Sequence, residues 1–128
     1  VDVTIHEPGR EVPIGPDGGR GGLEAYIGLP ALAARYGPDV EGFLLARANV
    51  DDTPLQALIR AIRIAHALYR MDHCLLLGGT GARLARLSEQ IKRRVEDGLT
   101  SLARPGWSVG CAIHDHHAAV GAARLSIT

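Results

Sequence analysis

The stretch Cys74-Leu75-Leu76-Leu77-Gly78-Gly79-Thr80-Gly81 decides how this chain folds. Its apolar first half predicts a short buried strand, and its glycines predict a tight turn that opens directly into a helix. Bare backbone N–H groups at such a junction can hold a phosphate. A strand-to-helix turn without any ligand predicts the same residues, so this stretch alone leaves both interpretations open.

Two common nucleotide-binding patterns are missing around these glycines. The sequence has no Gly-Lys dipeptide, which excludes a Walker A loop. Leu84 stands where the dinucleotide fingerprint needs its third small residue. A phosphate contact here would therefore be of another type.

The clearest helix start lies upstream of the strand, at Thr53-Pro54-Leu55-Gln56. Thr53 suits the N-cap, Pro54 suits the first helical position, and Gln56 stands at the capping-box position. Apolar residues then recur at three- and four-residue spacing until near Met71: Leu55, Leu58, Ile59, Ile62, Ala65, His66 and Tyr69. This spacing predicts an amphipathic helix with one buried stripe.

The segment after the glycines predicts a helix, a strand and a final helix. The first helix is expected over residues 82–102, with one apolar face made of Leu84, Leu87, Ile91, Val95, Leu99 and Leu102. Pro105-Gly106 ends it, and residues 107–113 are expected as the second strand. Asp115 would cap the final helix, residues 116–125. Two strands joined through a helix favour a parallel pair with a right-handed crossover.

The N-terminal part is expected to be a strand, a loop and three short helices. Asp2-Val3-Thr4-Ile5-His6 contains β-branched residues in alternation and is expected as a strand. Residues 7–22 contain six Gly and three Pro, which predicts a loop. The helices are expected at Leu23–Ile27, Pro30–Tyr36 and Asp39–Asn49.

These elements predict a single α/β domain over residues 1–128, rich in helix and with a small, partly parallel sheet. Residues 1–22 would supply the first strand and the Gly-rich loop, and residues 23–71 the helical segment. Residues 72–128 would supply the strand–helix–strand–helix unit. An incomplete sheet leaves an exposed edge and an uncovered apolar face, so we expect a homodimer or a larger assembly.

Composition favours a globular domain without a nucleic-acid or membrane partner. Hydrophobic residues make up 46% of the chain, and its 14 basic and 14 acidic side chains give a net charge of zero. Lys92-Arg93-Arg94 is expected to be a solvated helix face. No apolar run approaches the roughly 18 residues of a membrane span. Two cysteines in apolar runs and the lack of a signal segment predict a cytoplasmic protein, and the missing start Met suggests that an upstream part has been removed.

The histidines do not predict a metal site. His114, His116 and His117 surround Asp115, but adjacent residues at a helix start point in different directions, and no Cys or acidic partner follows at helical spacing. His66 lies at the edge of an apolar stripe, where a core or boundary histidine is expected rather than a catalytic one. We therefore expect no metal ligands.

In order and spacing, three groups of residues resemble the ROK family of repressors, open reading frames and sugar kinases. Val3-Thr4-Ile5, the Gly-rich loop and Gly21-Gly22-Leu23-Glu24-Ala25-Tyr26 look like the family's Gly-Cys-x-Glu segment. The helix at 55–69 followed by Leu75–Gly79 looks like its second-domain helix and Leu-Gly-Gly strand end. Ala118-Ala119-Val120-Gly121-Ala122-Ala123 is similar to its closing Gly-Ala-Ala helix.

The resemblance implies that this chain is the C-terminal half of an actin-like ATPase fold of the ribonuclease H-like class. The parent protein would transfer a phosphoryl group from ATP, with Mg²⁺, to a hexose-type sugar. Glu24, and Asp2 as a weaker second, would accept hydrogen bonds from the sugar, although a first-turn Glu is also favoured by the helix dipole alone. The nucleotide side of the cleft would be lined by Gly78, Gly79, Thr80 and Gly81.

The same resemblance implies that the phosphate-binding first domain and the catalytic Asp lie upstream of Val1. No catalytic residue is therefore expected in this chain, which should be inactive alone. The family's zinc-binding cysteines would fall near Gly15, Asp17 and Gly22, where none is present. We expect no zinc, and a loop held instead by glycine turns or by an Asp17–Arg20 pair.

Two other functions remain open from the sequence. The chain could be the non-catalytic sugar-sensing domain of a ROK-type transcriptional repressor. It could also be a degenerate domain that only dimerises, which the loss of zinc ligands makes more plausible. The sequence does not identify the sugar.

Overall fold

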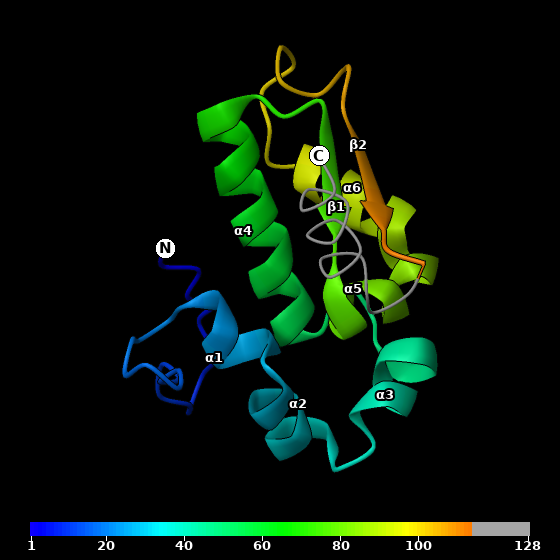
Figure 1. The fold of residues 1–128 in the computed structure, drawn as a ribbon. Helices are drawn as coiled ribbons and strands as arrows, with labels where there is room; N and C mark the ends of the chain where they lie inside the picture. Colours follow the sequence, from blue (N-terminus) through cyan, green and yellow to red (C-terminus); the bar gives the residue numbers. More distant parts are fainter. Residues whose placement is uncertain (114–128) are drawn as a thin grey trace, which may run out of the picture.

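The computed structural model describes residues 1–113. Its α-helices are α1 (Leu23–Ile27), α2 (Leu29–Tyr36), α3 (Val40–Gly42), α4 (Thr53–Tyr69), α5 (Gly78–Arg83) and α6 (Ser88–Glu96). A π-helix, η1, covers Phe43–Arg47, and a 3-10 helix, η2, covers Ala85–Leu87. The strands are β1 (His73–Leu76) and β2 (Ser108–Cys111). Figure 1 shows α4 running beside β1, with α2 and α3 gathered beyond the N-terminal end of α4. The helix predicted at 116–125 lies outside the described residues.

The two strands form a parallel sheet, as the sequence predicts. His73 lies opposite Ser108, and Leu76 lies opposite Cys111. Both strands are shorter than the predicted 73–77 and 107–113. Alternation along β1 turns Cys74 and Leu76 toward the core, whereas Leu75 on the other face is 47% exposed. The chain is thus an α/β protein whose small sheet is covered on one face by α4 and α6.

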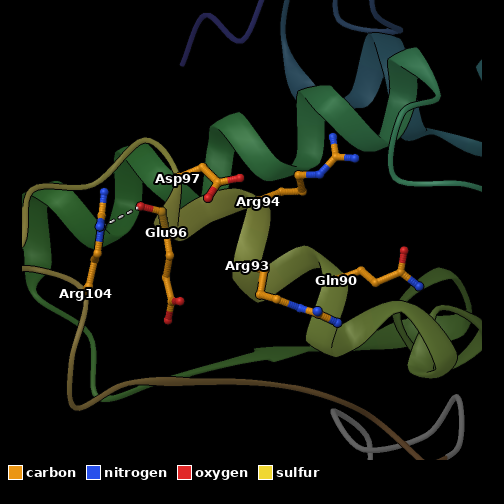
Figure 2. Close-up of a pocket in the computed structure, with 6 residues that line it drawn as sticks. All are labelled: Gln90, Arg93, Arg94, Glu96, Asp97 and Arg104. Carbon is orange, nitrogen blue, oxygen red and sulfur yellow. Dashed lines mark hydrogen bonds between the residues drawn. The ribbon is translucent and has the colours of Figure 1, made fainter.

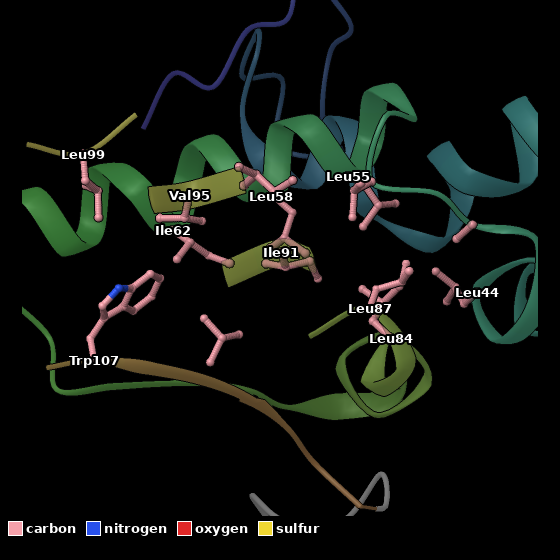
Figure 3. Packing of buried hydrophobic residues seen from close by; sticks show 14 of the residues in the cluster. Leu44, Leu55, Leu58, Ile62, Leu84, Leu87, Ile91, Val95, Leu99 and Trp107 are labelled. Atoms are coloured by element: carbon pink, nitrogen blue, oxygen red, sulfur yellow. The ribbon is translucent and has the colours of Figure 1, made fainter. Parts of the chain in front are cut away.

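One main hydrophobic core joins the helices to the sheet. Figure 3 shows Leu58 and Ile62 of α4 facing Ile91 and Val95 of α6. The buried members of this core are Leu32, Phe43, Leu44, Ala48, Val50, Leu55, Leu58, Ile59, Ile62, Leu84, Leu87, Ile91, Val95, Leu99, Ala103, Trp107 and Val109. Most of the stripe predicted on α4 is therefore buried, but Tyr69 at its C-terminal end is 76% exposed.

Trp107 and His66 close one end of this core. The indole is 5% exposed, stacks on the His66 ring with centroids 4.7 Å apart, and donates Nε1–H to Glu96 Oε1 at 3.1 Å. His66 is 3% exposed, and its Nε2 lies 2.8 Å from the carbonyl oxygen of Ala103. His66 is therefore the core histidine that the sequence predicts.

Helix α4 begins at Thr53, but the predicted capping box is wrong. The N-cap is Asp52, and its side chain caps nothing. Thr53 Oγ1 instead donates to Glu7 Oε2 at 3.1 Å, and Gln56 Nε2 donates to the carbonyl of Asp51 at 2.8 Å. A hydrogen bond to an ionised, half-buried carboxylate is stronger than a neutral cap, so the long-range partner takes the hydroxyl.

The single helix predicted over residues 82–102 is also wrong. The chain divides into α5, η2 and α6, and α6 ends at Glu96. Guanidinium groups and backbone N–H groups share its last carbonyls: Arg63 donates to those of Arg94 and Val95, Arg104 donates to that of Glu96, and the N–H groups of Gly98 and Leu99 donate to those of Val95 and Glu96. These bonds satisfy carbonyls that another helical turn would otherwise bond. Leu102, predicted on the buried face, is consequently 82% exposed.

The strand predicted at residues 2–6 is not formed. Val3 N–H donates to the carbonyl of Gly21 at 2.8 Å, and Ile5 N–H donates to the Tyr26 hydroxyl oxygen at 3.0 Å. Asp2 Oδ1 accepts the N–H of Thr4 at 2.9 Å. Local and side-chain partners thus replace a neighbouring strand. Val3, Tyr26 and Ala57 form a second, smaller buried cluster against α4.

The short helices after the loop agree with the sequence. α1 and α2 match the predicted 23–27 and 30–36, and the segment predicted at 39–49 forms α3 and η1. Arg86 fixes η1, because its Nε and Nη2 donate to the carbonyls of Leu45 and Ala48, each at 2.7 Å. Within residues 1–113, no helix has both the length and the apolar composition that crossing a membrane requires.

Candidate functional site

The glycine segment lies inside α5, not in a separate turn before a helix. Gly78 starts α5 with φ of +77°, a conformation that favours glycine. Gly81 is buried against β1, where a Cβ atom would lie 2.5 Å from the carbonyl carbon and oxygen of Leu76. The helix therefore begins four residues earlier than predicted. This close contact between helix and strand accounts for Gly81 without a ligand.

Two residues of the glycine segment line a cavity of about 530 Å³, which we call the Thr80 cavity. Gly79 and Thr80 form one part of its wall. The other lining residues are Leu29, Pro38, Asp39, Val40, Glu41, Leu44 and Arg83. Thr80 and Gly81 also border a smaller, mainly apolar cavity of about 230 Å³ beside Leu75 and Leu77. Gly78 lines neither cavity.

Charged side chains form one side of the Thr80 cavity. Arg83 Nε lies 3.5 Å from Glu41 Oε1, and this pair joins α5 to α3. Asp39 already has partners: its Oδ1 accepts the N–H of Gly42 at 3.0 Å, and its Oδ2 lies 3.6 Å from Arg47 Nη1. Both side chains are largely exposed, Asp39 at 69% and Glu41 at 65%, and Glu41 is the more available acceptor because the Asp39 carboxylate also accepts the N–H of Gly42.

Glu24 lines a second cavity, of about 720 Å³, which we call the Glu24 cavity. Its wall is made by the Gly-rich loop, α1 and α2: Arg10, Glu11, Pro13, Ile14, Gly15, Pro16, Glu24, Ala25, Pro30, Ala31, Ala34 and Arg35. Carboxylates, guanidinium groups and apolar ring faces therefore meet in one hollow. Such a mixture suits a ligand that carries many hydroxyl groups on an apolar ring.

The first turn of α2 separates the two cavities. Leu29 lines the Thr80 cavity, and the next residue, Pro30, lines the Glu24 cavity. Glu24 on one side, and Gly79 and Thr80 on the other, thus line two hollows that share one short helix as a wall.

Asp2, the second predicted sugar residue, does not line the Glu24 cavity. Its Oδ1 accepts both the N–H and the hydroxyl of Thr4, at 2.9 and 2.5 Å. These hydrogen bonds from Thr4 hold the pKa of the Asp2 carboxyl below its ordinary value. The structure therefore brings Glu24 to the cavity and leaves Asp2 outside it.

The Gly-rich loop is held by its own backbone, one of the two predicted arrangements. Gly15 and Gly19 are joined by a 2.8 Å hydrogen bond, and Gly21 N–H donates to the carbonyl of Pro13 at 3.0 Å. Asp17 Oδ1 accepts the N–H of Gly19 at 2.9 Å, so Asp17 stabilises the loop without the predicted Arg20 partner. The wall of the Glu24 cavity is consequently a folded hairpin-like loop.

An ion pair that the sequence does not reveal ties this loop to the helices. Arg35 Nη1 and Nη2 donate to the two oxygens of Glu7 at 3.0 and 2.6 Å, and Thr53 donates to the same carboxylate. The side chains of Arg35 and Glu7 are only 15% and 20% exposed. The hydrogen bonds from Arg35 lower the pKa of the Glu7 carboxyl. This pair fixes the position of the cavity wall relative to α2 and α4.

Replacing Glu7 with glutamine is expected to lower the free energy of unfolding at pH 7 by about 1–3 kcal/mol, because a half-buried guanidinium loses its counter-ion. Glu7 has a lower pKa when folded than its ordinary 4.5, so its contribution is present above that pH and is lost as the pH falls through the lowered value. Urea unfolding monitored by circular dichroism between pH 3 and 7 measures both effects. Glu11→Gln, on the same loop, should change neither. If the free energy of unfolding of Glu7→Gln fell between pH 7 and pH 3 as steeply as that of the unaltered chain, this assignment would be contradicted.

The basic run at 92–94 borders a polar hollow of about 570 Å³ lined by Gln90, Arg93, Arg94, Glu96, Asp97 and Arg104. Figure 2 shows Arg104 at one end of it and Gln90 at the other, with Glu96 and Arg93 between them. Arg94 pairs with Asp51 at 2.6 Å, Lys92 pairs with Glu96 at 3.2 Å, and Arg104 bonds backbone carbonyls of Glu96 and Leu99. These contacts hold α6 in place and do not converge on one point. The hollow is therefore a weaker candidate than the two cavities beside α2.

The cysteines are not a reactive pair. Cys74 and Cys111 are both free and partly buried, and burial raises the pKa of each thiol. Within residues 1–113, no three His, Cys, Asp or Glu side chains gather as metal ligands would. The cluster of His114, His116 and His117 lies outside the described residues, so the expectation of no metal stays a prediction.

Comparison of the chain with protein-family models, curated proteins and solved structures finds no match. The function is therefore inferred from the two cavities and from the motifs of the sequence. The sequence predicted Glu24 and the Gly79-Thr80 pair, which line the two cavities, but it did not indicate the ion pairs Glu7–Arg35 and Glu41–Arg83. Each of these pairs joins residues far apart in the chain, so no local pattern signals it.

Proposed function

We propose that this chain is the C-terminal, ligand-contacting part of an ATP-dependent sugar kinase similar to the ROK family. Glu24 accepts hydrogen bonds from sugar hydroxyls, and Gly79 and Thr80 contact the nucleotide. The actin-like fold belongs to the same proposal. It is consistent with a parallel β1–β2 pair connected through α5 and α6, but a two-stranded sheet does not distinguish that fold from others.

The observation that carries the proposal is the arrangement of the two cavities around the first turn of α2. Phosphoryl transfer needs an acceptor hydroxyl and a nucleotide brought together. A hollow with Glu24 for hydroxyl groups and a hollow with Gly79 and Thr80 for a nucleotide lie on either side of Leu29-Pro30. The motifs of the sequence point independently to the same two groups of residues.

The residues of this chain would bind and orient, and would not perform the chemical step. ATP with Mg²⁺ supplies the transferable phosphoryl group and the charge that stabilises its transfer. Glu24 would hold the sugar by accepting hydroxyl protons in hydrogen bonds. The general base would belong to the rest of the parent protein, as would the contacts to the reacting phosphate. The longer protein would work in the cytoplasm, as an oligomer.

A Glu24→Ala variant of the full parent protein tests this role. We expect its kcat/KM for the sugar to fall by about 100-fold, since a charged hydrogen-bond acceptor for the substrate is lost. A coupled ADP-release assay with a panel of hexoses measures it, and Glu89→Ala, an exposed carboxylate on α6, is the control. Undiminished turnover in Glu24→Ala would remove Glu24 from the site.

The repressor-type alternative predicts different results for sugar binding and for ADP release. A sugar-sensing domain would bind a sugar and rise in melting temperature with it, because a ligand that binds only the folded state stabilises that state. It would release no ADP with any sugar. A degenerate dimerising domain would show neither the thermal shift nor turnover.

A further inference from the structure

The Thr80 cavity has walls of two kinds, which indicate the part of a nucleotide that it would take. Leu29, Val40 and Leu44 offer apolar surface, and Leu29 is 61% exposed. Asp39 and Glu41 contribute carboxylates to the same hollow. Carboxylates repel a phosphate but accept hydrogen bonds from hydroxyl groups. Arg83 also lines the cavity, but its guanidinium is paired with Glu41 at 3.5 Å, so the carboxylate side of the cavity is better suited to a base and a ribose than to the phosphate chain.

Among the acceptors in this cavity, Glu41 is the one placed to act on a ligand. Asp39 is bonded to Gly42 and lies near Arg47. Glu41 is mostly exposed, and its ion pair with Arg83, at 3.5 Å, is long enough to leave the carboxylate oxygens able to accept further hydrogen bonds.

Arg83 also fixes where that carboxylate lies. Gly79 and Arg83 are four residues apart on α5, so they lie on the same side of the helix, one turn apart. The Glu41–Arg83 pair therefore joins the carboxylate of α3 to the helix that carries Gly79 and Thr80. A nucleoside that contacts Thr80 would present its ribose toward Glu41.

Resting on the proposed function, we infer that Glu41 is the residue that recognises the ribose hydroxyls of the bound nucleotide. Glu41 would accept hydrogen bonds from those hydroxyls, and Arg83 would be its positioning residue. The cavity would then select ribonucleotides over nucleotides that lack the hydroxyls.

Isothermal titration calorimetry with ADP and 2′,3′-dideoxy-ADP on the full parent protein tests this inference. We expect the unaltered chain to bind ADP about tenfold more tightly, the difference that one charge-assisted hydrogen bond makes at an exposed position. In Glu41→Ala the ratio should fall toward one, mainly because ADP binds more weakly. Glu89→Ala, which removes a carboxylate outside the cavity, should keep the tenfold ratio.

The outcomes separate this inference from the proposed function. If ADP binds but the two ligands bind equally well, Glu41 does not recognise the ribose, and the proposed nucleotide contact stands. The same conclusion follows if Glu41→Ala keeps the preference for ADP. If neither nucleotide binds at millimolar concentration, the nucleotide side of the proposed function fails and this inference fails with it.

Discussion

Trp107→Ala is expected to lower the free energy of unfolding by about 3–5 kcal/mol, the usual cost of removing a large aromatic side chain from a core. The indole is 5% exposed and rests on the buried ring of His66, so alanine would leave a cavity beside an imidazole. The variant also removes the hydrogen bond from the indole N–H to Glu96, which keeps its ion pair with Lys92. Because small domains are stable by only about 5–15 kcal/mol, this loss brings the chain close to unfolding.

Urea unfolding followed by circular dichroism measures this loss, since Trp107 is the only tryptophan of the chain and its fluorescence disappears in the variant. Leu102→Ala in the same loop is the matched control: that side chain is 82% exposed, and we expect a change within about 0.5 kcal/mol. Trp107→Phe keeps the aromatic packing and loses the hydrogen bond, so it should cost less than alanine. Equal effects of Trp107→Ala and Leu102→Ala would contradict the described core.

Gly81→Ala is expected to destabilise the chain by about 2 kcal/mol, the opposite of what this exchange does inside most helices. Alanine normally favours a helix over glycine by about 1 kcal/mol. At Gly81, however, the added methyl group would lie 2.5 Å from the backbone of Leu76, which cannot move without disturbing β1. The helix and the strand would have to separate.

Gly22→Ala serves as the matched control for Gly81→Ala. Gly22 precedes α1 with φ of −75°, and a Cβ atom there meets nothing within 4 Å, so we expect a loss below about 1 kcal/mol. Chemical denaturation of both variants gives the comparison. If the two glycines tolerate alanine equally, the contact between α5 and β1 is looser than described. Gly81 would then need another reason, such as close approach of a ligand.

The sequence predicted those features of the fold that depend on local periodicity. The helix at Thr53–Tyr69, the strand at 73–76 and the parallel pairing all follow from the spacing of apolar residues and from helix-connected strands. The positions at Leu84, Leu87, Ile91 and Val95 were correctly assigned to the core as well. The spacing of the apolar residues predicted that these positions are buried. It did not reveal the break between α5 and α6, because both helices keep the same face toward the core.

Two of the wrong predictions, the capping box at Thr53 and the single helix over residues 82–102, go with long-range hydrogen bonds from an arginine or to a carboxylate. Arg63 reaches from α4 to end α6, and Thr53 turns from its helix terminus to Glu7. The residues next to Arg63 and Thr53 in the sequence do not indicate either of these long-range contacts. The candidate site shows the same limit. Glu24 and Thr80 carry motif signals, whereas the Glu41–Arg83 pair exists only after α3 has folded against α5.

Helix α4 contacts both hydrophobic clusters, and this has a consequence for how the molecule opens. Leu55, Leu58, Ile59 and Ile62 belong to the main core, whereas Ala57 faces the cluster with Val3 and Tyr26. Amide protons of α4 should therefore exchange with solvent only when the whole chain unfolds. Those of residues 1–22 need only the smaller cluster and the Glu7 ion pair to separate, so they should exchange through partial opening. The loop that forms the Glu24 cavity would then detach and return many times during the life of one folded molecule.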